Sequence, residues 1–337
     1  MINIKVLKME DTKKVLKLED VIDCVRNVYE AKASGNTEVF PLIFQDFIHE
    51  KAEMDIKSGW LKNNEIFGLK VVSWFEENPK AGLPELLGTI LIFDANTGAP
   101  VGLVDGSYIT GIRTGAAGAL GAKALARPES ENLLVVGTGN VAFFAVASML
   151  KLFPDLKKIQ VCNIQDNASA QRFAAEFPKR LEESFGMKGY QTEIIATDNL
   201  EKAVGESDII FTVTPSREPL IKKEWLKEGT HLTCIGSDME GKEEIDPAIF
   251  NQALVYVDDR EQCINVGEIE IPIKQGYMNR DDIAGEIGEA LLKQNGRENE
   301  RQITVFDTTG VALLDLATGM LAIEEAEKQK LGQIVEI

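Results

Sequence analysis

A glycine-rich turn between a strand and a helix is the feature that most constrains how this chain can fold. Residues 132–142, Asn-Leu-Leu-Val-Val-Gly-Thr-Gly-Asn-Val-Ala, form an apolar run that ends in Gly137-x-Gly139-x-x-Ala142. In such a turn the first glycine allows a tight bend, the second lets the backbone approach a pyrophosphate, and a small third residue lets the helix pack against its strand. The pattern predicts a dinucleotide site at a helix N-terminus, although an ordinary strand-to-helix turn can have the same sequence.

The turn begins more than a third of the way along the 337 residues, a length for which two domains are the default expectation. Ahead of it, apolar residues between Val21 and Tyr29 recur at helical spacing. Three short apolar runs between residues 66 and 105 are separated by turn residues and predict an antiparallel sheet. The small residues of 110–126 predict a tightly packed connecting helix.

Beyond the turn, strand and helix patterns alternate, which is typical of a doubly wound parallel sheet. The expected strands are 133–136, 159–163, 193–196, 208–213, 231–235, 255–257 and 303–306. A last amphipathic helix, from about 311 to 328, is expected to return to the first domain. We therefore predict an α/β protein with a Rossmann domain over residues 116–310 and an α+β domain over residues 1–115 plus about 311–337.

Composition excludes several classes of function. The formal net charge is −18 and no lysines form a dense block, whereas nucleic-acid binding needs a concentrated basic face. No apolar stretch is long enough to cross a bilayer, and the N-terminus lacks the apolar block of a signal peptide. We expect a cytoplasmic protein with no nucleic-acid and no membrane partner.

A metal site or a disulfide framework is not expected either. The four cysteines are widely separated without a Cys-x-x-Cys pair, and His49 and His231 are isolated in the sequence. Cys162 and Cys234 stand inside apolar runs, where a buried, unreactive thiol is the favoured interpretation.

Three charged residues stand where a ligand could reach them. Lys70 lies in an apolar strand, where a lysine usually occupies the solvent face. Arg113 is expected in the first turn of the small-residue helix, where the helix dipole disfavours a cation unless an anion is near. Asp238 follows the C-terminal end of a parallel strand, which makes it a candidate acid or base.

The chain resembles the ornithine cyclodeaminase and mu-crystallin family. The similar segments follow the family's order from about residue 50 to 320 and are Gly68-Leu-Lys70, Gly82-Leu-Pro84, 94–100, 109–117, Gly137-Thr-Gly139, 208–214, 235–242 and 306–310. The resemblance implies a homodimer in which the first domain makes the dimer contact and part of the substrate site, while the Rossmann domain binds a nicotinamide cofactor.

The resemblance also implies roles for individual residues. Lys70 and Arg113 would hold the substrate's α-carboxylate, and Asp238 would exchange protons at the α-nitrogen or an attacking water, which makes Lys70 and Asp238 the catalytic candidates. Thr309 falls on a substrate-contact position. Arg113 would also touch cofactor phosphate, and the other cofactor-contact positions are Thr114, Gly137, Gly139, Asn140, Val141, Asn163, Thr214, Ile235, Gly236, Ser237, Asp238, Lys242 and Thr308.

The chain departs from the family pattern in two places. The family commonly has a further carboxylate-binding arginine ahead of its lysine strand, and here Lys57 is the nearest cationic substitute, with a solvated lysine as the alternative. At the end of the second Rossmann strand, where an NAD-preferring site has a carboxylate, the chain has Asn163. Asp166 could be the ribose partner instead, so NAD is favoured and NADP stays possible.

We predict an NAD(P)-dependent oxidoreductase of amino-acid metabolism that transfers hydride at the α-carbon of an amino acid or its imine. Its partner would be a small amino-acid, keto-acid or imine substrate, handled by an imine reductase or an amino-acid dehydrogenase. One alternative is a redox-neutral cyclodeaminase of the ornithine or lysine type, a lyase that retains its NAD. Another is a non-catalytic, crystallin-like protein that binds cofactor or ligand.

Overall fold

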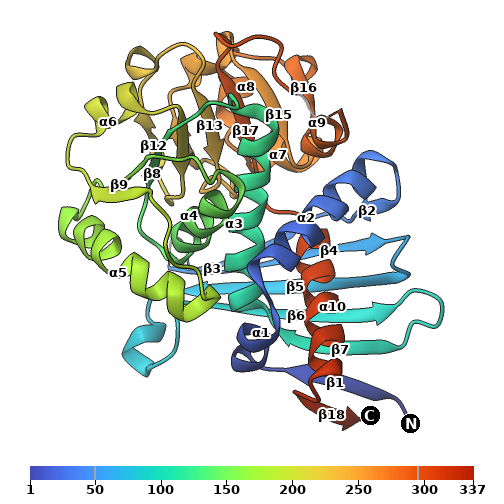
Figure 1. Cartoon of the computed structure of the whole chain (residues 1–337). Helices are drawn as coiled ribbons and strands as arrows, with labels where there is room; N and C mark the ends of the chain where they lie inside the picture. The colour runs from blue at the N-terminus through green and yellow to red at the C-terminus, as the bar shows by residue number, and fades with distance from the viewer. Residues whose placement is uncertain (49–50, 294–295) are drawn as a thin grey trace. The chain divides into compact units, whose positions relative to one another are not determined.

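The computed structural model describes residues 1–48, 51–293 and 296–337 (Figure 1). His49 lies outside the described residues. The chain divides into two compact units, Met1–Arg113 with Val311–Ile337, and Thr114–Gly310. Helix α3 (Gly106–Leu125) begins in the first unit and continues into the second. The roles assigned above to the two domains stay predictions.

The first unit is built on a mixed sheet with helices on one face. Its strands follow the order β18-β1-β7-β6-β5-β4-β2, with β3 paired to β4. The pairs from β4 to β7 are antiparallel, which confirms the antiparallel sheet expected over residues 66–105. The elements of this unit are β1 (Asn3–Leu7), α1 (Met9–Val15), α2 (Leu18–Ala33), β2 (Thr37–Val39), β3 (Ile43–Ile48), β4 (Ala52–Leu61), β5 (Ile66–Phe75), the 3₁₀ turn η1 (Asn78–Ala81), β6 (Leu86–Asp94), β7 (Pro100–Asp105), α10 (Ala312–Lys328) and β18 (Gln333–Glu336).

Helix α10 returns to this unit and crosses the strands of its sheet (Figure 1). The approach is so close that strand positions beneath the helix are glycines. A Cβ at Gly68 would stand 2.8 Å from Leu316, and one at Gly102 would stand 2.3 Å from Ile323. A glycine inside a strand weakens the strand but allows such an approach. The close packing places the side chains of α10 directly over β4 to β7.

The second unit is a doubly wound parallel sheet. Its strand order is β10-β9-β8-β11-β13-β17-β15-β16, and neighbours in this order run parallel, which confirms the Rossmann fold. The same unit also contains a separate sheet of two strands, β12 and β14. The elements are β8 (Asn132–Val136), α4 (Asn140–Leu152), β9 (Lys158–Cys162), α5 (Asn167–Phe185), β10 (Glu193–Ala196), α6 (Leu200–Glu206), β11 (Ile209–Thr212), β12 (Arg217–Ile221), η2 (Lys223–Trp225), β13 (His231–Cys234), β14 (Glu243–Ile245), η3 (Pro247–Asn251), β15 (Leu254–Val257), α7 (Arg260–Val266), α8 (Glu270–Gln275), η4 (Arg280–Asp282), β16 (Ile283–Glu286), α9 (Ile287–Lys293) and β17 (Thr304–Asp307).

The small residues of α3 let this helix pack closely within the second unit. A Cβ at Gly115 would stand 2.4 Å from the backbone carbon of Phe144 in α4, and one at Gly121 would stand 2.1 Å from the ring of Phe306. Side chains larger than hydrogen would force these elements apart. The prediction of a tightly packed helix is confirmed, and its packing fixes α4 and the glycine turn ahead of it.

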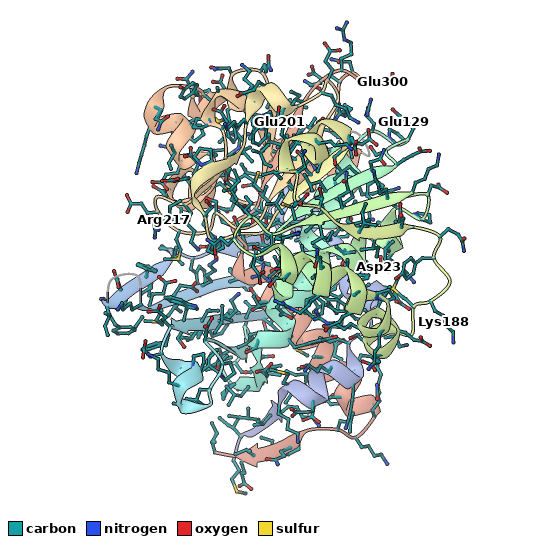
Figure 2. The ribbon with its side chains drawn as sticks, turned by 90° about the vertical axis from the view of Figure 1, so that its left-hand side faces the viewer. Asp23, Glu129, Lys188, Glu201, Arg217 and Glu300 are labelled. Atoms are coloured by element: carbon teal, nitrogen blue, oxygen red, sulfur yellow. The ribbon has the colours of Figure 1, made fainter. Side chains whose placement is uncertain are left out.

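Charged side chains cover the surface. Glu129, Glu201 and Glu300 are exposed and extend outward, as do Lys188 and Arg217 (Figure 2). Among the described residues, no helix is long and apolar enough to cross a membrane.

Candidate active site

The turn between β8 and α4 contains two glycines, and the structure explains each of them differently. Gly137 has a φ of 119°, and a Cβ there would stand 2.6 Å from the carbonyl oxygen of Val213. Gly139 caps α4 with a φ of −73°, and a Cβ there would meet no other heavy atom within 4 Å. The fold therefore requires glycine at 137, whereas Gly139 leaves open space before the N-terminus of α4.

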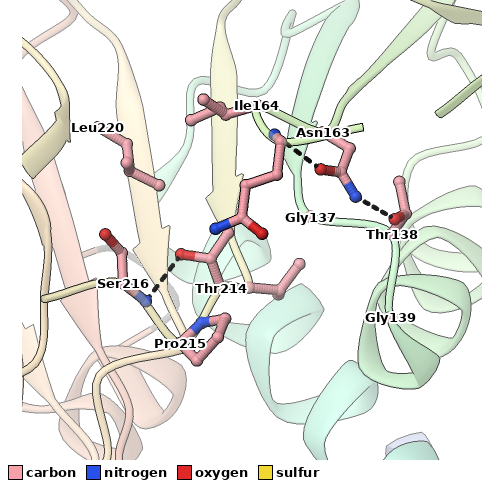
Figure 3. Close-up of a pocket in the computed structure, with 11 residues that line it drawn as sticks. Gly137, Thr138, Gly139, Asn163, Ile164, Thr214, Pro215, Ser216 and Leu220 are labelled. Atoms are coloured by element: carbon pink, nitrogen blue, oxygen red, sulfur yellow. Dashed lines mark hydrogen bonds between the residues drawn. The ribbon is translucent and has the colours of Figure 1, made fainter. Parts of the chain in front are cut away.

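A cavity of about 310 Å³ opens beside this turn (Figure 3). Among the described residues that line it, none carries a charge. The turn, the β9–α5 loop and the segment after β11 supply its lining, which is Gly137, Thr138, Gly139, Asn163, Ile164, Gln165, Val213, Thr214, Pro215, Ser216 and Leu220. Gly137, Gly139, Asn163 and Thr214 are thus four predicted cofactor residues that one cavity brings together. The other predicted cofactor residues are not among its lining residues.

The amide of Asn163 organises one wall of the cavity. Its Nδ2 donates to Thr138 Oγ1 at 2.8 Å, as Figure 3 shows, and its Oδ1 accepts from the backbone N–H groups of Gln165 and Asp166. The Asp166 carboxylate caps α5 by accepting from Ala168 N, and it also accepts from Ser169 and Arg172. The hydrogen bond from Ser169 is the main cause that lowers the pKa of Asp166. Asp166 is therefore an anion already held by its own helix.

A buried carboxylate, Glu244 of β14, joins the loops that follow β11 and β13. Its two oxygens accept from Thr212 Oγ1, from Thr214 N and Oγ1, and from Gly236 N, at 2.7–2.8 Å. Burial raises the pKa of Glu244, and these hydrogen bonds oppose that shift. Four donors at one carboxylate fix the position of Thr214 at the cavity wall.

Asp258 has the same function for the segment after β17. Its carboxylate accepts from Thr308 Oγ1 at 2.9 Å, from Thr309 Oγ1 at 3.2 Å and from Gly310 N at 2.7 Å. Gln262 Nε2 donates to Thr309 Oγ1 at 2.9 Å. Thr308 and Thr309, predicted as cofactor and substrate contacts, are therefore buried residues whose hydroxyls point at one acid.

Asp238 lies four residues past the end of β13, at the carboxyl edge of the parallel sheet as the sequence predicts. Its Oδ1 lies 2.7 Å from Lys242 Nζ, and its side chain is 40% exposed. Ser237 is buried, and its Oγ donates to the carbonyl of Lys242. An accessible carboxylate can accept a proton and its protonated form can donate one, which is what the proposed acid–base role requires. Asn140 is exposed at the start of α4, Val141 is half-buried, and Thr114 and Ile235 are buried.

Within the first unit, the predicted substrate cations form one buried cluster. Lys57 and Lys70 are directly opposite each other on β4 and β5. Lys70 Nζ lies 3.0 Å from Asp315 Oδ2, and Arg113 Nε donates to Asp315 Oδ1 at 2.9 Å. Exposure is 6% for Lys57, 2% for Lys70, 3% for Arg113 and 0% for Asp315. The solvent-exposed alternatives for Lys57 and Lys70 are therefore wrong.

Burial has a large electrostatic consequence for Lys70. Desolvation lowers its pKa to about 8; Asp315 and, more weakly, Asp55 oppose that shift, while Arg113 and Lys57 add to it. The pKa of Asp315 is held below its usual value because the adjacent Arg113 and Lys70 outweigh its burial. Like charges directly opposite in a sheet are destabilising, so the Lys57–Lys70 pair has a cost that folding alone does not require.

The predicted position of Arg113 within its helix is wrong. Helix α3 begins at Gly106, directly after β7, where Asp105 accepts a hydrogen bond from Tyr108 N. Arg113 therefore stands two turns into the helix instead of in its first turn, and the helix dipole does not account for it. Its anion is the carboxylate of Asp315.

Comparison with known proteins identifies the family. The model of the ornithine cyclodeaminase/mu-crystallin family matches residues 3–330. The chain belongs to this family. The resemblance inferred from the sequence motifs is thereby confirmed.

Three similar proteins illustrate what members of the family do. The alanine dehydrogenase of Archaeoglobus fulgidus is 30% identical over 98% of both chains. A solved archaeal alanine dehydrogenase, a dimer with bound NAD, is 29% identical, covers 100% of both chains and has a TM-score of 0.90. The Δ1-pyrroline-2-carboxylate reductase of Thermococcus litoralis, solved with NADH and L-proline, is 31% identical, covers 98% of this chain and 99% of its own, and has a TM-score of 0.89.

Sequence reasoning missed three acids that hold predicted site residues, Asp315 in the first unit and Glu244 and Asp258 in the second. Each is fully buried and binds groups whose roles were predicted. The sequence does contain a signal that Asp315 is buried. It is the one charged residue in the apolar run 311–319, and a helix that is apolar on all sides is buried. Glu244 and Asp258 lie in segments rich in other acids, where the sequence does not distinguish a buried carboxylate from an exposed one.

Proposed function

We propose that this family member is an NAD-dependent enzyme of amino-acid metabolism that transfers hydride at the α-carbon of an amino acid or its imine. The observation that carries the proposal is the buried cluster of Lys57, Lys70 and Arg113. Lys70 and Arg113 share the carboxylate of Asp315, while Lys57 and Asp55 lie near Lys70. Buried charges are stable when they are paired, and two cations that share one carboxylate favour binding of a further anion. A substrate α-carboxylate has the charge and the planar geometry that a guanidinium and an ammonium bind well.

The relatives support the reaction class. An alanine dehydrogenase and a Δ1-pyrroline-2-carboxylate reductase differ in substrate but share NAD or NADH in their solved structures. Both act on a carbon that carries nitrogen and a carboxylate. We infer the same chemistry for this chain, with the substrate side chain left to the experiment below.

The cavity beside Gly139 suits NAD better than NADP. The open space at Gly139 and the N-terminus of α4 can receive a pyrophosphate. The 2′-phosphate of NADP needs a cation, and no charged side chain lines the described part of this cavity. The nearby Arg172 is bound to Asp166. Gly137, Asn163 and Thr214 would hold the cofactor at the cavity wall.

The chain's own residues would bind the substrate and move its proton. Lys70 and Arg113 would hold the α-carboxylate, with Lys57 opposite Lys70 in place of the family's further arginine. Thr309 would contact the substrate. Asp238 would exchange a proton at the α-nitrogen or at an attacking water. When bound, NAD supplies the hydride exchange at the α-carbon, while the protein supplies orientation.

We also propose that the chain forms a homodimer through its first unit. Strand β3 exposes Ile43, Phe44, Phe47 and Ile48, and within the described residues its one partner strand is β4. Large apolar side chains on an edge strand are typical of an interface. The similar archaeal enzyme is a dimer. Light scattering coupled to gel filtration tests the proposal, and a monomer at micromolar concentration contradicts it. A cytoplasmic location stays a prediction from the sequence.

The experiment that tests the function is a screen of keto acids with ammonium or methylamine, and of cyclic imino acids, with NADH and NADPH in parallel. Oxidation of NADH by at least one substrate, faster than oxidation of NADPH, is the expected result. Turnover of ornithine or lysine to a proline-like product without net absorbance change would instead indicate a cyclodeaminase. Cofactor binding with no turnover of the whole panel would favour a non-catalytic binding protein.

A further inference from the structure

Asp315 is the centre of the cation cluster. It lies in the first turn of α10, where a carboxylate is favoured by the helix dipole, and apolar neighbours such as Leu314 and Leu316 surround it in the helix. Its Oδ1 binds Arg113 of α3, and its Oδ2 is paired with Lys70 of β5. One acid thus joins two elements that are far apart in sequence.

We propose that Asp315 is a positioning residue that orients the Lys70 and Arg113 side chains for a substrate carboxylate and keeps Lys70 protonated. The inference rests on the proposed function, because it assigns a role toward the same substrate. Asp315 itself is an anion and would repel a carboxylate, so its role is exerted through its two cationic partners.

The hydrogen bonds leave the binding edge of Arg113 available. Asp315 takes the Nε–H of Arg113. Within the part of the chain that the structure describes, no residue accepts a hydrogen bond from either terminal nitrogen of Arg113. A guanidinium held at Nε keeps its plane fixed, and its terminal N–H groups can then bind a carboxylate. Substrate binding would therefore find Arg113 already oriented.

The charges around Lys70 explain why its protonation depends on Asp315. Lys57 and Asp55 face it from β4, Arg113 from α3 and Asp315 from α10, while its partner on β6 is the apolar Ile90. Burial, Arg113 and Lys57 all favour the neutral amine, and Asp315 is the largest influence that favours the ammonium. Without this carboxylate, Lys70 would lose its proton at a lower pH.

The test is the pH dependence of carboxylate binding in Asp315→Asn. In the wild type, affinity for pyruvate, measured by calorimetry, and kcat/KM for a substrate from the screen should both fall above about pH 8, where Lys70 loses its proton. In Asp315→Asn both falls should move down by at least about one pH unit, which means about fivefold weaker binding at pH 8 and nearly tenfold at higher pH. The matched control is Glu327→Gln, which removes an exposed carboxylate from the same helix and should leave both curves unchanged.

Two further variants keep the test decisive if Asp315→Asn folds poorly. Asp315→Glu keeps the charge but moves it by one methylene, so the pH of the fall should stay while the KM rises several-fold. Lys57→Met removes a like charge opposite Lys70, so the fall should move to higher pH. Unchanged pH curves in Asp315→Asn, or an unchanged KM in Asp315→Glu, would overturn the proposal.

The outcomes separate this inference from the proposed function. If pyruvate binding shows the expected pH shift but no substrate is turned over, Asp315 positions a carboxylate site and the proposed activity fails. If the wild type turns over a substrate and Asp315→Asn behaves like Glu327→Gln, only the positioning inference fails. A wild type that, with NADH present, binds neither pyruvate nor any other carboxylate of the screen at pH 7 overturns both.

Discussion

The two glycines of the nucleotide turn offer a sharp test of the proposed cofactor site, because they should fail in different ways. Gly137→Ala places a methyl group at a backbone φ of 119° and 2.6 Å from the carbonyl oxygen of Val213. Gly139→Ala places the same methyl group at a φ of −73°, with no other heavy atom within 4 Å. The first change strains the folded protein, whereas the second fills space that only a ligand would use.

The magnitudes follow from these geometries. An alanine at the φ of Gly137 costs roughly 1–3 kcal/mol, and the contact with Val213 adds roughly 1–3 kcal/mol of overpacking. At about 2–4 °C per kcal/mol, the Tm should fall by roughly 5–20 °C. Gly139→Ala should leave the Tm unchanged or slightly higher, because alanine restricts the unfolded chain by about 0.4–1 kcal/mol. Its methyl group would displace the pyrophosphate from one or two backbone N–H groups, each worth about 1.5–3 kcal/mol, so the Kd for NADH should rise at least about tenfold.

The assays are thermal unfolding of the protein without cofactor and fluorescence titration with NADH. Gly186→Ala is the matched control, because Gly186 has a φ of 64°, no neighbour within 4 Å of a Cβ and a position at the C-terminus of α5. It should lower the Tm through backbone strain and leave the affinity for NADH unchanged. If Gly139→Ala binds NADH as the wild type does, the pyrophosphate does not approach this turn. If it is as destabilised as Gly137→Ala, the assignment of the open space is wrong.

Three further predictions concern the predicted site residues Asp238 and Arg113 and the buried Asp307. Asp238→Asn should lower kcat by roughly 10²–10⁴-fold, the usual contribution of a general acid or base, and leave the Kd for NADH nearly unchanged; full activity in steady-state kinetics would remove Asp238 from the mechanism. Arg113→Ala should raise the substrate KM and also weaken NADH binding, and the carboxylate clamp is misplaced if neither value moves. Burial raises the pKa of Asp307 to about 8, so the folded state binds more protons than the unfolded state between about pH 4 and 8. The contribution of Asp307 to stability is full below that range and decreases as the pH rises through it. In Asp307→Asn, the free energy of unfolding measured with urea should therefore fall less steeply over this range. An equally steep fall would contradict the raised pKa of Asp307.

The main architecture could be predicted because buried parallel strands are continuous apolar runs. Strands β8 and β11 lie inside the sheet with both faces covered, so their residues are apolar except for Asn132 and Thr212 at the strand ends. Strand β3 was missed for the opposite reason, since all its residues are exposed and no burial pattern distinguishes it from a loop. Strand β4 contains Asp55 and Lys57 within a strand that packs under α10, and charged residues of this kind conceal a strand in the sequence.

The site could be predicted only in part. Motifs located Lys70, Arg113 and the glycine turn, because each belongs to a short local pattern. The partner of Arg113 lies 202 residues away on α10, and no local pattern relates the two. Asn163 illustrates the same limit. Its position at the end of β9 was predicted, but its amide is used to hold the loop around Thr138 and Asp166.

Buried acids have a similar structural role in each unit, where one carboxylate fixes each segment that we propose to bind ligand. Within the first unit, Asp315 binds Lys70 and Arg113. Within the second unit, Glu244 binds Thr214 and Gly236, and Asp258 binds Thr308 and the residues after it. A carboxylate accepts several hydrogen bonds and adds no donor, which is why acids suit loops whose N–H and hydroxyl groups lack partners.

This design implies that single substitutions should separate the two ligands. Glu244→Gln puts one amide NH₂ among four donors, so it loses about two hydrogen bonds to the loops at the cofactor cavity. We expect the Kd for NADH to rise by roughly 5–50-fold, while the pH dependence of pyruvate binding stays that of the wild type. Asp315→Asn should shift the pH dependence of pyruvate binding and leave the Kd for NADH close to that of the wild type. A variant of either acid that weakens both ligands to the same degree would indicate one cooperative site and contradict the separate roles.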